Sequence, residues 1–128
     1  MQDRFLEEDL IHKTRRGESV RSKSEVIIAN LLYEAGVDYS YELSFIGNDG
    51  KKRYPDFTIE DADSGQLILW EHLGMLKDPG YRERWNNKLA WYRSQEILPS
   101  DEGGGSRGTL IITRDDDRGG IHLYFCRN

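Results

Sequence analysis

The chain has 128 residues, 37% of them hydrophobic and 32% charged, and its net charge is −5. This length allows one domain with a real core and is too short for two ordinary domains. No apolar run approaches the roughly 20 residues that span a bilayer, the N-terminus has no signal-peptide pattern, and the single cysteine, Cys126, excludes an internal disulfide, so we expect a cytoplasmic (intracellular) protein without membrane contacts.

The first predicted elements are a short helix and a basic loop. Apolar residues recur near helical spacing between residues 3 and 12. Residues 12–25 hold five Lys or Arg residues and two acids. The negative net charge argues against nucleic-acid binding, but a local basic patch would still suit it. Acids gather elsewhere, among them residues 115–117, where we expect solvated turns.

A buried helix is predicted next. Ser22 and Glu25 have the spacing of a capping box, with Ser22 as the N-cap. The segment that follows, VIIANLLYEA, is apolar nearly all round and ends before Gly36, which is a good C-terminal stop. The capping box by itself explains Glu25, although a helix packed on a sheet can also bring this acid to a site there.

The remaining pattern predicts three strands, a helix and two further strands. The strands cover 38–45, 53–60 and 66–73, with Pro55 indicating an edge or a bulge in the second. A long helix follows over 80–97, then a buried strand over 108–114 and a final strand in IHLYF. This order predicts an α/β protein with an αβββαβ core, in which a central mixed sheet of four to five strands is flanked by helices.

Two acids fall at the adjoining ends of neighbouring predicted strands. Asp56 follows Pro55, and Glu71 ends the stretch LILW, whose apolar residues face both sides. A carboxylate at the end of a buried strand is costly unless it is paired or holds a metal. Taken singly, each acid has an equally good structural explanation. Asp56 would be a bulge or turn acid beside Pro55, and Glu71 would be an acid at the end of a strand that pairs with an arginine. Together, two converging carboxylates favour a hard, oxygen-ligated cation such as Mg²⁺.

Lys88 is the third component of the expected site. Tyr81, Trp85, Lys88 and Tyr92 are spaced by 4, 3 and 4 residues, so they share one helical face. That face is aromatic and should pack inward. Lys88 therefore either extends to the rim or points at an anionic group.

Three motifs in this order resemble the PD-(D/E)XK nuclease superfamily, which has the restriction-endonuclease-like fold. They are SKSE at 22–25, YPDF at 54–57 and LILWEHLG at 67–74. The resemblance covers residues 20–114. With the further runs Y...W..K..WY and LIIT, the chain is similar to nuclease domains attached to superfamily 1 DNA helicases.

The resemblance implies metal-dependent hydrolysis of DNA phosphodiester bonds. Asp56 and Glu71 would bind Mg²⁺ (or Mn²⁺) with the His72 backbone carbonyl, and Glu25 would be a further ligand or support the ligands. The family motif places its lysine two residues after Glu71, where this chain has a leucine. Lys88 would then take its role, orienting the attacking water or offsetting charge on the phosphate.

The resemblance also suggests partners and boundaries. We expect a role in DNA repair, processing or defence beside a helicase domain in the same or another chain, or as a homodimer, because a lone domain has little surface for gripping a duplex. Residues 1–19 would be an N-terminal extension, 20–114 the core and 115–128 a C-terminal hairpin strand, all excised from a larger helicase-like protein. The candidate contacts to nucleic acid are Arg15, Arg16, Arg21, Lys23, Arg53, Tyr81 and Tyr92.

Two other interpretations stay open. A catalytically inactive nuclease-fold module that binds nucleic acid or serves in assembly is favoured by Leu73 and by the negative net charge. A metal-binding protein unrelated to nucleic acid leaves the basic stretch unexplained. Geometry discriminates, because a Lys88 nitrogen within several ångströms of the Asp56 and Glu71 carboxylates favours catalysis, whereas a solvated Lys88 favours the inactive module.

Overall fold

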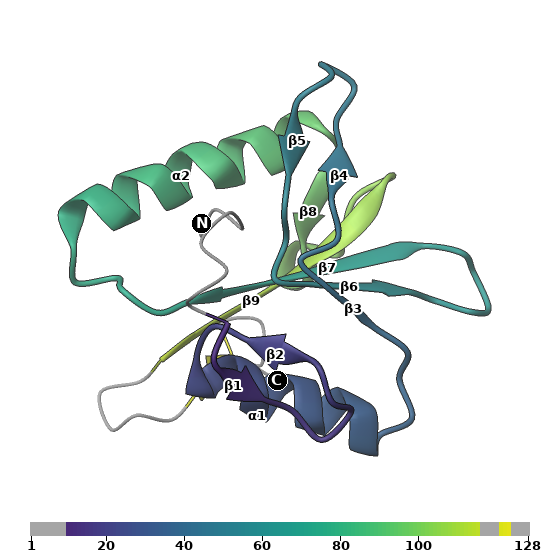
Figure 1. The fold of residues 1–128 in the computed structure, drawn as a ribbon. Coiled ribbons are helices and arrows are strands. Elements are labelled where there is room, and N and C mark those ends of the chain that lie inside the picture. Colours follow the sequence, from purple (N-terminus) through teal and green to yellow (C-terminus); the bar gives the residue numbers. More distant parts are fainter. Residues whose placement is uncertain (1–9, 116–120, 124–128) are drawn as a thin grey trace.

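The computed structural model describes residues 10–115 and 121–123 (Figure 1). A mixed sheet with the strand order β10-β9-β7-β6-β3 forms its centre, and β8 also pairs with β9. Figure 1 shows α1 (Lys23–Glu34) below this sheet and α2 (Pro79–Ser94) above it. The prediction of a mixed α/β protein with a central sheet and flanking helices is confirmed. Within the described residues, neither helix is long and apolar enough to cross a membrane.

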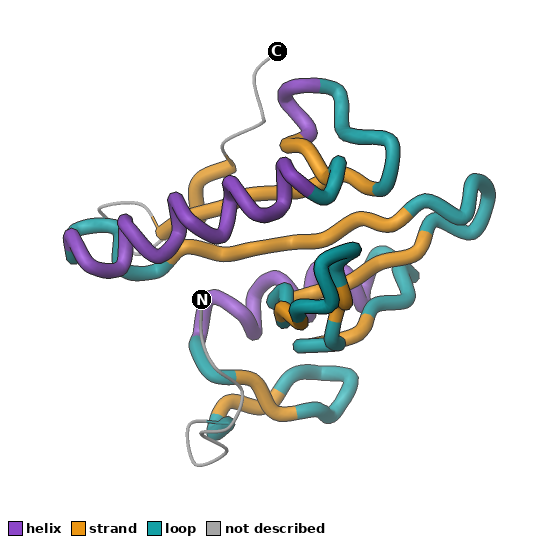
Figure 2. Tube along the Cα trace, turned by 90° about the horizontal axis from the view of Figure 1, so that it is seen from above, coloured by secondary structure: helices purple, strands orange, loops and turns teal. Residues whose placement is uncertain are grey.

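The order of strand directions follows the predicted meander and crossover. The sheet strands are β3 (Ser40–Tyr41), β6 (Phe57–Glu60), β7 (Leu67–Leu73), β8 (Ile97–Pro99), β9 (Gly108–Asp115) and β10 (Ile121–Leu123). The first three pair antiparallel, and β9 runs parallel to β7 after the chain has crossed the sheet through α2. Figure 2 shows α2 extending along these central strands.

Two predicted strands are interrupted. The strand expected over 38–45 divides into β3 and β4 (Phe45–Ile46), separated by Glu42, which has a φ of 53°. The strand expected over 53–60 divides into β5 (Lys52–Arg53) and β6 around Pro55, which has no N–H for a ladder. β4 and β5 form the predicted hairpin around the Asn48–Gly50 turn, as a separate small sheet.

The N-terminal prediction is partly wrong. Of the helix expected over 3–12, residues 3–9 lie outside the described residues, and His12–Lys13 form β1. β1 pairs with β2 (Ser19–Val20), so this part of the basic stretch is a hairpin instead of a loop. At the other end, β10 confirms a strand in the C-terminal segment, while Cys126 lies outside the described residues.

Both helices begin where the sequence predicts. The Ser22 side chain accepts a hydrogen bond from the Glu25 N–H at 3.2 Å and caps α1. α1 is less buried than its apolar sequence suggests, because Ile27 and Leu31 are 50% and 58% exposed. α2 ends three residues before the predicted boundary, and Ile97 belongs to β8. The predicted inward face of α2 is confirmed, since all four of its residues are buried.

The glycine-rich connection between β8 and β9 is required by the fold. A Cβ on Gly105 would lie 2.1 Å from the Glu96 carbonyl oxygen, which is main chain and cannot easily move. We expect Gly105→Ala to lower the free energy of unfolding by about 2–3 kcal/mol in urea titrations. Gly80→Ala is the control, because there the nearest atom is the end of the Arg84 side chain at 3.4 Å and a helix favours alanine. A similar loss in both variants would contradict this account.

Candidate active site

The site begins where β6 and β7 pair. Phe57 lies opposite Trp70 in this antiparallel ladder, so the next step of the register places Asp56 opposite Glu71. Residues directly opposite each other project to the same face of a sheet. Both acids are buried, with 5% and 0% of their surface exposed. The structure therefore brings together the two carboxylates that the sequence placed on neighbouring strands.

Asp56 is held by the main chain of β7. Its Oδ2 accepts a hydrogen bond from the His72 N–H at 2.7 Å. The N–H and C=O of one residue in a strand point toward the same neighbouring strand. The His72 carbonyl therefore also points toward β6, where the register places Pro55. Because proline has no N–H, it offers this carbonyl no ladder hydrogen bond. The Pro-Asp sequence therefore places two hard oxygen donors close together, the His72 carbonyl and the Asp56 carboxylate.

Glu71 is held from α2. Its Oε2 accepts a hydrogen bond from the Tyr92 hydroxyl at 2.6 Å and lies 2.7 Å from Lys88 Nζ. The Lys88 side chain is 9% exposed, so it points at an anionic group and does not extend to the rim. Burial by itself would lower the pKa of Lys88, but the charges of Glu71 and Asp56 outweigh burial and raise it. Lys88 is therefore a cation at neutral pH.

Burial and neighbouring acids raise the pKa values of Asp56 and Glu25. Burial, then the charge of Glu71, then that of Glu25, raise the pKa of Asp56 well above its usual range. Burial is also the main reason that the pKa of Glu25 is raised, with the charge of Glu42 acting in the same direction. A bound cation would lower both pKa values, because it favours the charged form of each carboxyl group.

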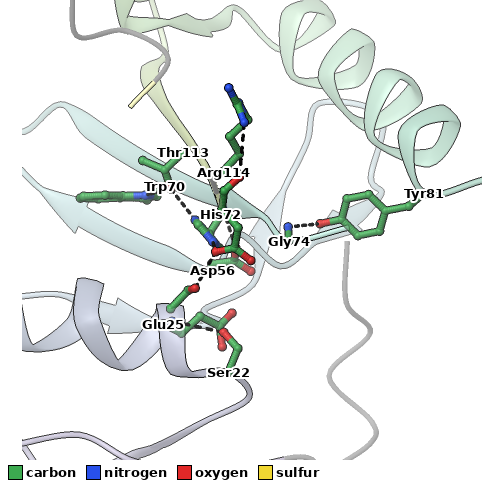
Figure 3. A network of polar contacts seen from close by, with 11 residues as sticks. Ser22, Glu25, Asp56, Trp70, His72, Gly74, Tyr81, Thr113 and Arg114 are labelled. Carbon is green, nitrogen blue, oxygen red and sulfur yellow. Dashed lines mark hydrogen bonds and ion pairs between the residues drawn. The ribbon is translucent and has the colours of Figure 1, made fainter. Parts of the chain in front are cut away.

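Glu25 approaches the cluster from α1. Its Oε1 accepts hydrogen bonds from the Tyr41 hydroxyl at 2.8 Å and from the Arg21 N–H at 2.9 Å. A full capping box would instead direct this carboxylate to the N–H of Ser22. The capping box thus explains Ser22 but not the position of the Glu25 carboxylate, which Figure 3 shows below Asp56.

A pocket of about 260 Å³ opens between these elements. Glu25 and Asp56 line it from α1 and from the entry to β6. Its further lining residues include Arg21, Ser22, His72, Gly74, Met75, Tyr81 and Asp115. The carboxylates therefore face a space that a substrate group can enter.

A second polar network, which the sequence did not indicate, lies on the other face of β7 (Figure 3). His72 Nε2 lies 2.7 Å from Asp115 Oδ1, and His72 Nδ1 lies 2.8 Å from Thr113 Oγ1. Asp115 also accepts a hydrogen bond from Ser24 at 2.6 Å, and Thr113 one from Trp70 at 3.0 Å. The imidazole thus fastens β7 to β9 and to α1.

The arginines of the basic stretch are bound to acids within the protein. Arg21 is buried, with 6% of its side chain exposed, and lies 2.7 Å from its acid. Arg21 also lines the pocket that contains Asp56, so its predicted contact with a phosphate stays a prediction. Arg15 and Arg16 are more exposed but also form ion pairs. The partners are Glu34 for Arg15, Glu18 for Arg16 and Glu42 for Arg21.

The other predicted nucleic-acid contacts are scattered. Tyr92 is 0% exposed, so its prediction as a contact is wrong, and its hydroxyl serves Glu71. Tyr81 lines the pocket. Lys23 is exposed in the first turn of α1. Arg53 lies over the ring of Trp91, with its guanidinium carbon 4.9 Å from the ring centre.

The oxygen donors present fit a hard divalent cation. Within the described residues, no group of three or more His, Cys, Asp or Glu side chains is arranged to hold a metal ion. Mg²⁺, however, is usually held by one or two carboxylates together with carbonyl oxygens and waters. The carboxylates of Asp56 and Glu71 and the carbonyl of His72 are donors of this kind.

Comparison with known proteins supplies a relative but no function. The chain is 44% identical over 72 residues, 56% of its length, to an uncharacterized protein of Methanocaldococcus jannaschii. These residues are 6% of that protein, which is therefore about 1,200 residues long, and the chain spans only a small part of it. No family model matches the chain, and no solved structure matches it.

Proposed function

We propose that the chain is an Mg²⁺-dependent nuclease that hydrolyses DNA phosphodiester bonds, with the restriction-endonuclease-like core of the PD-(D/E)XK superfamily. The position of Lys88 carries this proposal. Its Nζ is 2.7 Å from Glu71 Oε2, in the buried cluster that also contains Asp56. Leu73 stands where the family motif has its lysine, two residues after Glu71. In this chain, Lys88 on α2 places a cation beside the Glu71 carboxylate.

The residues of the cluster would have two kinds of role, binding the ion and positioning its ligands. Asp56, Glu71 and the His72 carbonyl would hold the ion, with Glu25 beside them. A bound Mg²⁺ supplies polarisation of a phosphate oxygen and a more acidic water. The Tyr92 hydroxyl and Lys88 fix the Glu71 carboxylate, and the His72 N–H fixes Asp56.

The ion pair of Lys88 with Glu71 supports a role as a cation. A lysine that keeps its proton at neutral pH cannot accept one from water. It can offset the negative charge that develops on the phosphate during cleavage, in a site with little competing solvent. We therefore assign Lys88 to charge stabilisation.

The proposed setting is a longer polypeptide. The similar segment belongs to a protein of about 1,200 residues, which supports a domain that works beside other domains. A helicase domain in the same or another chain would supply the grip on DNA that this domain lacks, as in DNA repair, processing or defence.

An inactive nuclease-fold module that binds nucleic acid is the second candidate. Leu73 favours it, because the motif lysine is missing from its usual place. In such a module, the ion pair of Lys88 with Glu71 would neutralise the site permanently and take the place of a metal.

A cleavage assay tests the proposal. Wild type and Asp56→Ala are incubated with linear and supercoiled DNA, single- and double-stranded, in Mg²⁺, Mn²⁺ or EDTA. We expect cleavage by the wild type in metal only, and a rate at least about 100-fold lower in the variant, because a ligand to the ion is lost. Asp63→Ala, in an exposed turn after β6, is the matched control and should cleave like the wild type. DNA binding without cleavage under all conditions would favour the inactive module.

A further inference from the structure

The β4–β5 hairpin is a cationic projection to which the proposed chemistry gives no role. Its residues, 45–53, include three cations and one acid. Figure 1 shows the hairpin standing away from the central sheet beside the end of α2. Lys51 and Lys52 are exposed and, within the described residues, neither forms an ion pair. The hairpin therefore presents a net positive charge on a protein that is negative as a whole.

One face of the hairpin is fixed to α2. Phe45 and Arg53 lie opposite each other in β4 and β5, and both contact the ring of Trp91. Asp49, the acid of the hairpin, accepts hydrogen bonds from Trp91 Nε1 at 2.8 Å and from the Lys51 N–H at 3.0 Å. These contacts hold the hairpin against the helix, and they engage both carboxylate oxygens of its acid.

The other face of the hairpin carries a cation beside an apolar side chain. Ile46 lies opposite Lys52, so both project to the same side of the two-stranded ribbon. Ile46 is 56% exposed. The backbone phosphates of DNA bind cations, and its base edges accept apolar contacts in the grooves. Because a two-stranded β-ribbon also fits the major groove, this face suits duplex DNA better than it suits a small anion.

A short segment joins the hairpin to the buried cluster. Lys52 and Asp56 are four residues apart, so their Cα atoms are at most about 14 Å apart. Successive phosphates of one DNA strand are about 3.4 Å apart along the helix axis. The hairpin therefore reaches DNA roughly four base pairs from a phosphate at Asp56.

We propose that the β4–β5 hairpin enters the major groove of duplex DNA beside the cleavage site, with Lys51 and Lys52 on backbone phosphates and Ile46 against base edges. This inference rests on the proposed function. Unlike the arginines of the basic stretch, these lysines bind a phosphate without breaking an ion pair within the protein. Two phosphate contacts position the duplex, and they do not replace the grip of a second domain.

Salt-dependent binding tests the charges of the hairpin. Fluorescence anisotropy of a labelled duplex and of its single strand is measured in EDTA, which prevents metal-dependent cleavage, for the wild type and for Lys51→Gln/Lys52→Gln. For the duplex, the slope of log K against log salt concentration should become less steep by about two. Lys51→Arg/Lys52→Arg keeps both charges and should keep the slope.

A second variant separates the apolar contact from the charges. Ile46→Ser should weaken duplex binding and leave the slope unchanged, because no cation is lost. The matched control, Lys13→Gln/Arg84→Gln, removes two exposed cations from β1 and α2. This control should bind like the wild type. An equal change of slope in the control would overturn the inference, because it would attribute binding to net charge.

The two forms of DNA test insertion into a groove. The affinity lost in Lys51→Gln/Lys52→Gln should be larger for the duplex than for the single strand. Equal losses for the two forms would assign the lysines to the backbone of a single strand and would overturn insertion into the duplex.

Three results separate the hairpin from the proposed function. An unchanged slope and affinity in Lys51→Gln/Lys52→Gln, with cleavage that still depends on Asp56, would overturn the role of the hairpin alone. A wild type that binds the duplex through the hairpin but never cuts it would support the hairpin and overturn the nuclease. A wild type that neither binds nor cuts DNA would overturn both.

Discussion

Lys88→Met is expected to lower the free energy of unfolding by about 3–5 kcal/mol at neutral pH, as the loss of one partner of a buried ion pair does. Glu71 is 0% exposed and its Oε2 lies 2.7 Å from Lys88 Nζ. The variant would leave this carboxylate buried without its cation. Methionine nearly matches the length of lysine, so the packing of the buried face of α2 is retained. Urea unfolding measured by circular dichroism gives the change.

Two further variants separate charge from packing. Adding Glu71→Gln to Lys88→Met removes the remaining buried charge, and the double variant should recover most of the lost stability. Arg93→Met breaks the ion pair with Glu102 on the outside of the same helix, where both side chains are 43% exposed. It should change stability little, because solvent screens exposed pairs. Equal losses in Lys88→Met and Arg93→Met would show that burial of the Glu71 pair is unimportant.

The parts of the fold that local spacing determines could be predicted. The inward face of α2 follows from residues three and four apart, so Lys88 could be placed among aromatic residues before any tertiary contact was known. The antiparallel pairing of β6 with β7 follows from a short turn between two strands, and it brings Asp56 opposite Glu71. These local regularities sufficed to assemble the acids and the lysine.

Contacts between distant segments could not be predicted. Asp115 belongs to a run of acids that is typical of a solvated turn, yet it binds His72, 43 residues earlier, and Ser24, 91 residues earlier. Arg21 forms an ion pair with Glu42, a residue whose φ of 53° interrupts a predicted strand. The sequence therefore indicated a basic patch where the folded chain has ion pairs.

Asp56→Asn is expected to make the metal-free protein more stable at neutral pH, although it alters the site. Burial, and then the charge of Glu71, raise the pKa of Asp56 in the folded protein well above the usual 3.8. The unfolded chain therefore loses this proton at lower pH than the folded protein does. The contribution of Asp56 to stability is complete below the unfolded-state pKa and declines as the pH rises toward the folded-state pKa. Asparagine has no such proton, and its oxygen can still accept the His72 N–H.

In the presence of a divalent cation, the wild type is expected to be more stable than Asp56→Asn. A ligand that binds only the folded state at 100 times its Kd stabilises a protein by about 2.7 kcal/mol. The wild type should gain this stability from Mn²⁺, whereas Asp56→Asn should gain little, because one carboxylate of the cation site is gone. Urea unfolding of both proteins in EDTA and in Mn²⁺, from acidic to neutral pH, measures the two effects separately.

The exposed turn acid Asp63 provides the reference for this experiment. Asp63→Asn should match the wild type in EDTA and in Mn²⁺, since this side chain is remote from the buried cluster. Equal stabilisation of the wild type and Asp56→Asn by Mn²⁺ would place the cation away from Asp56. In that case, the raised pKa of Asp56 would reflect burial beside Glu71 alone. The inactive module would then be the better interpretation of the domain's function.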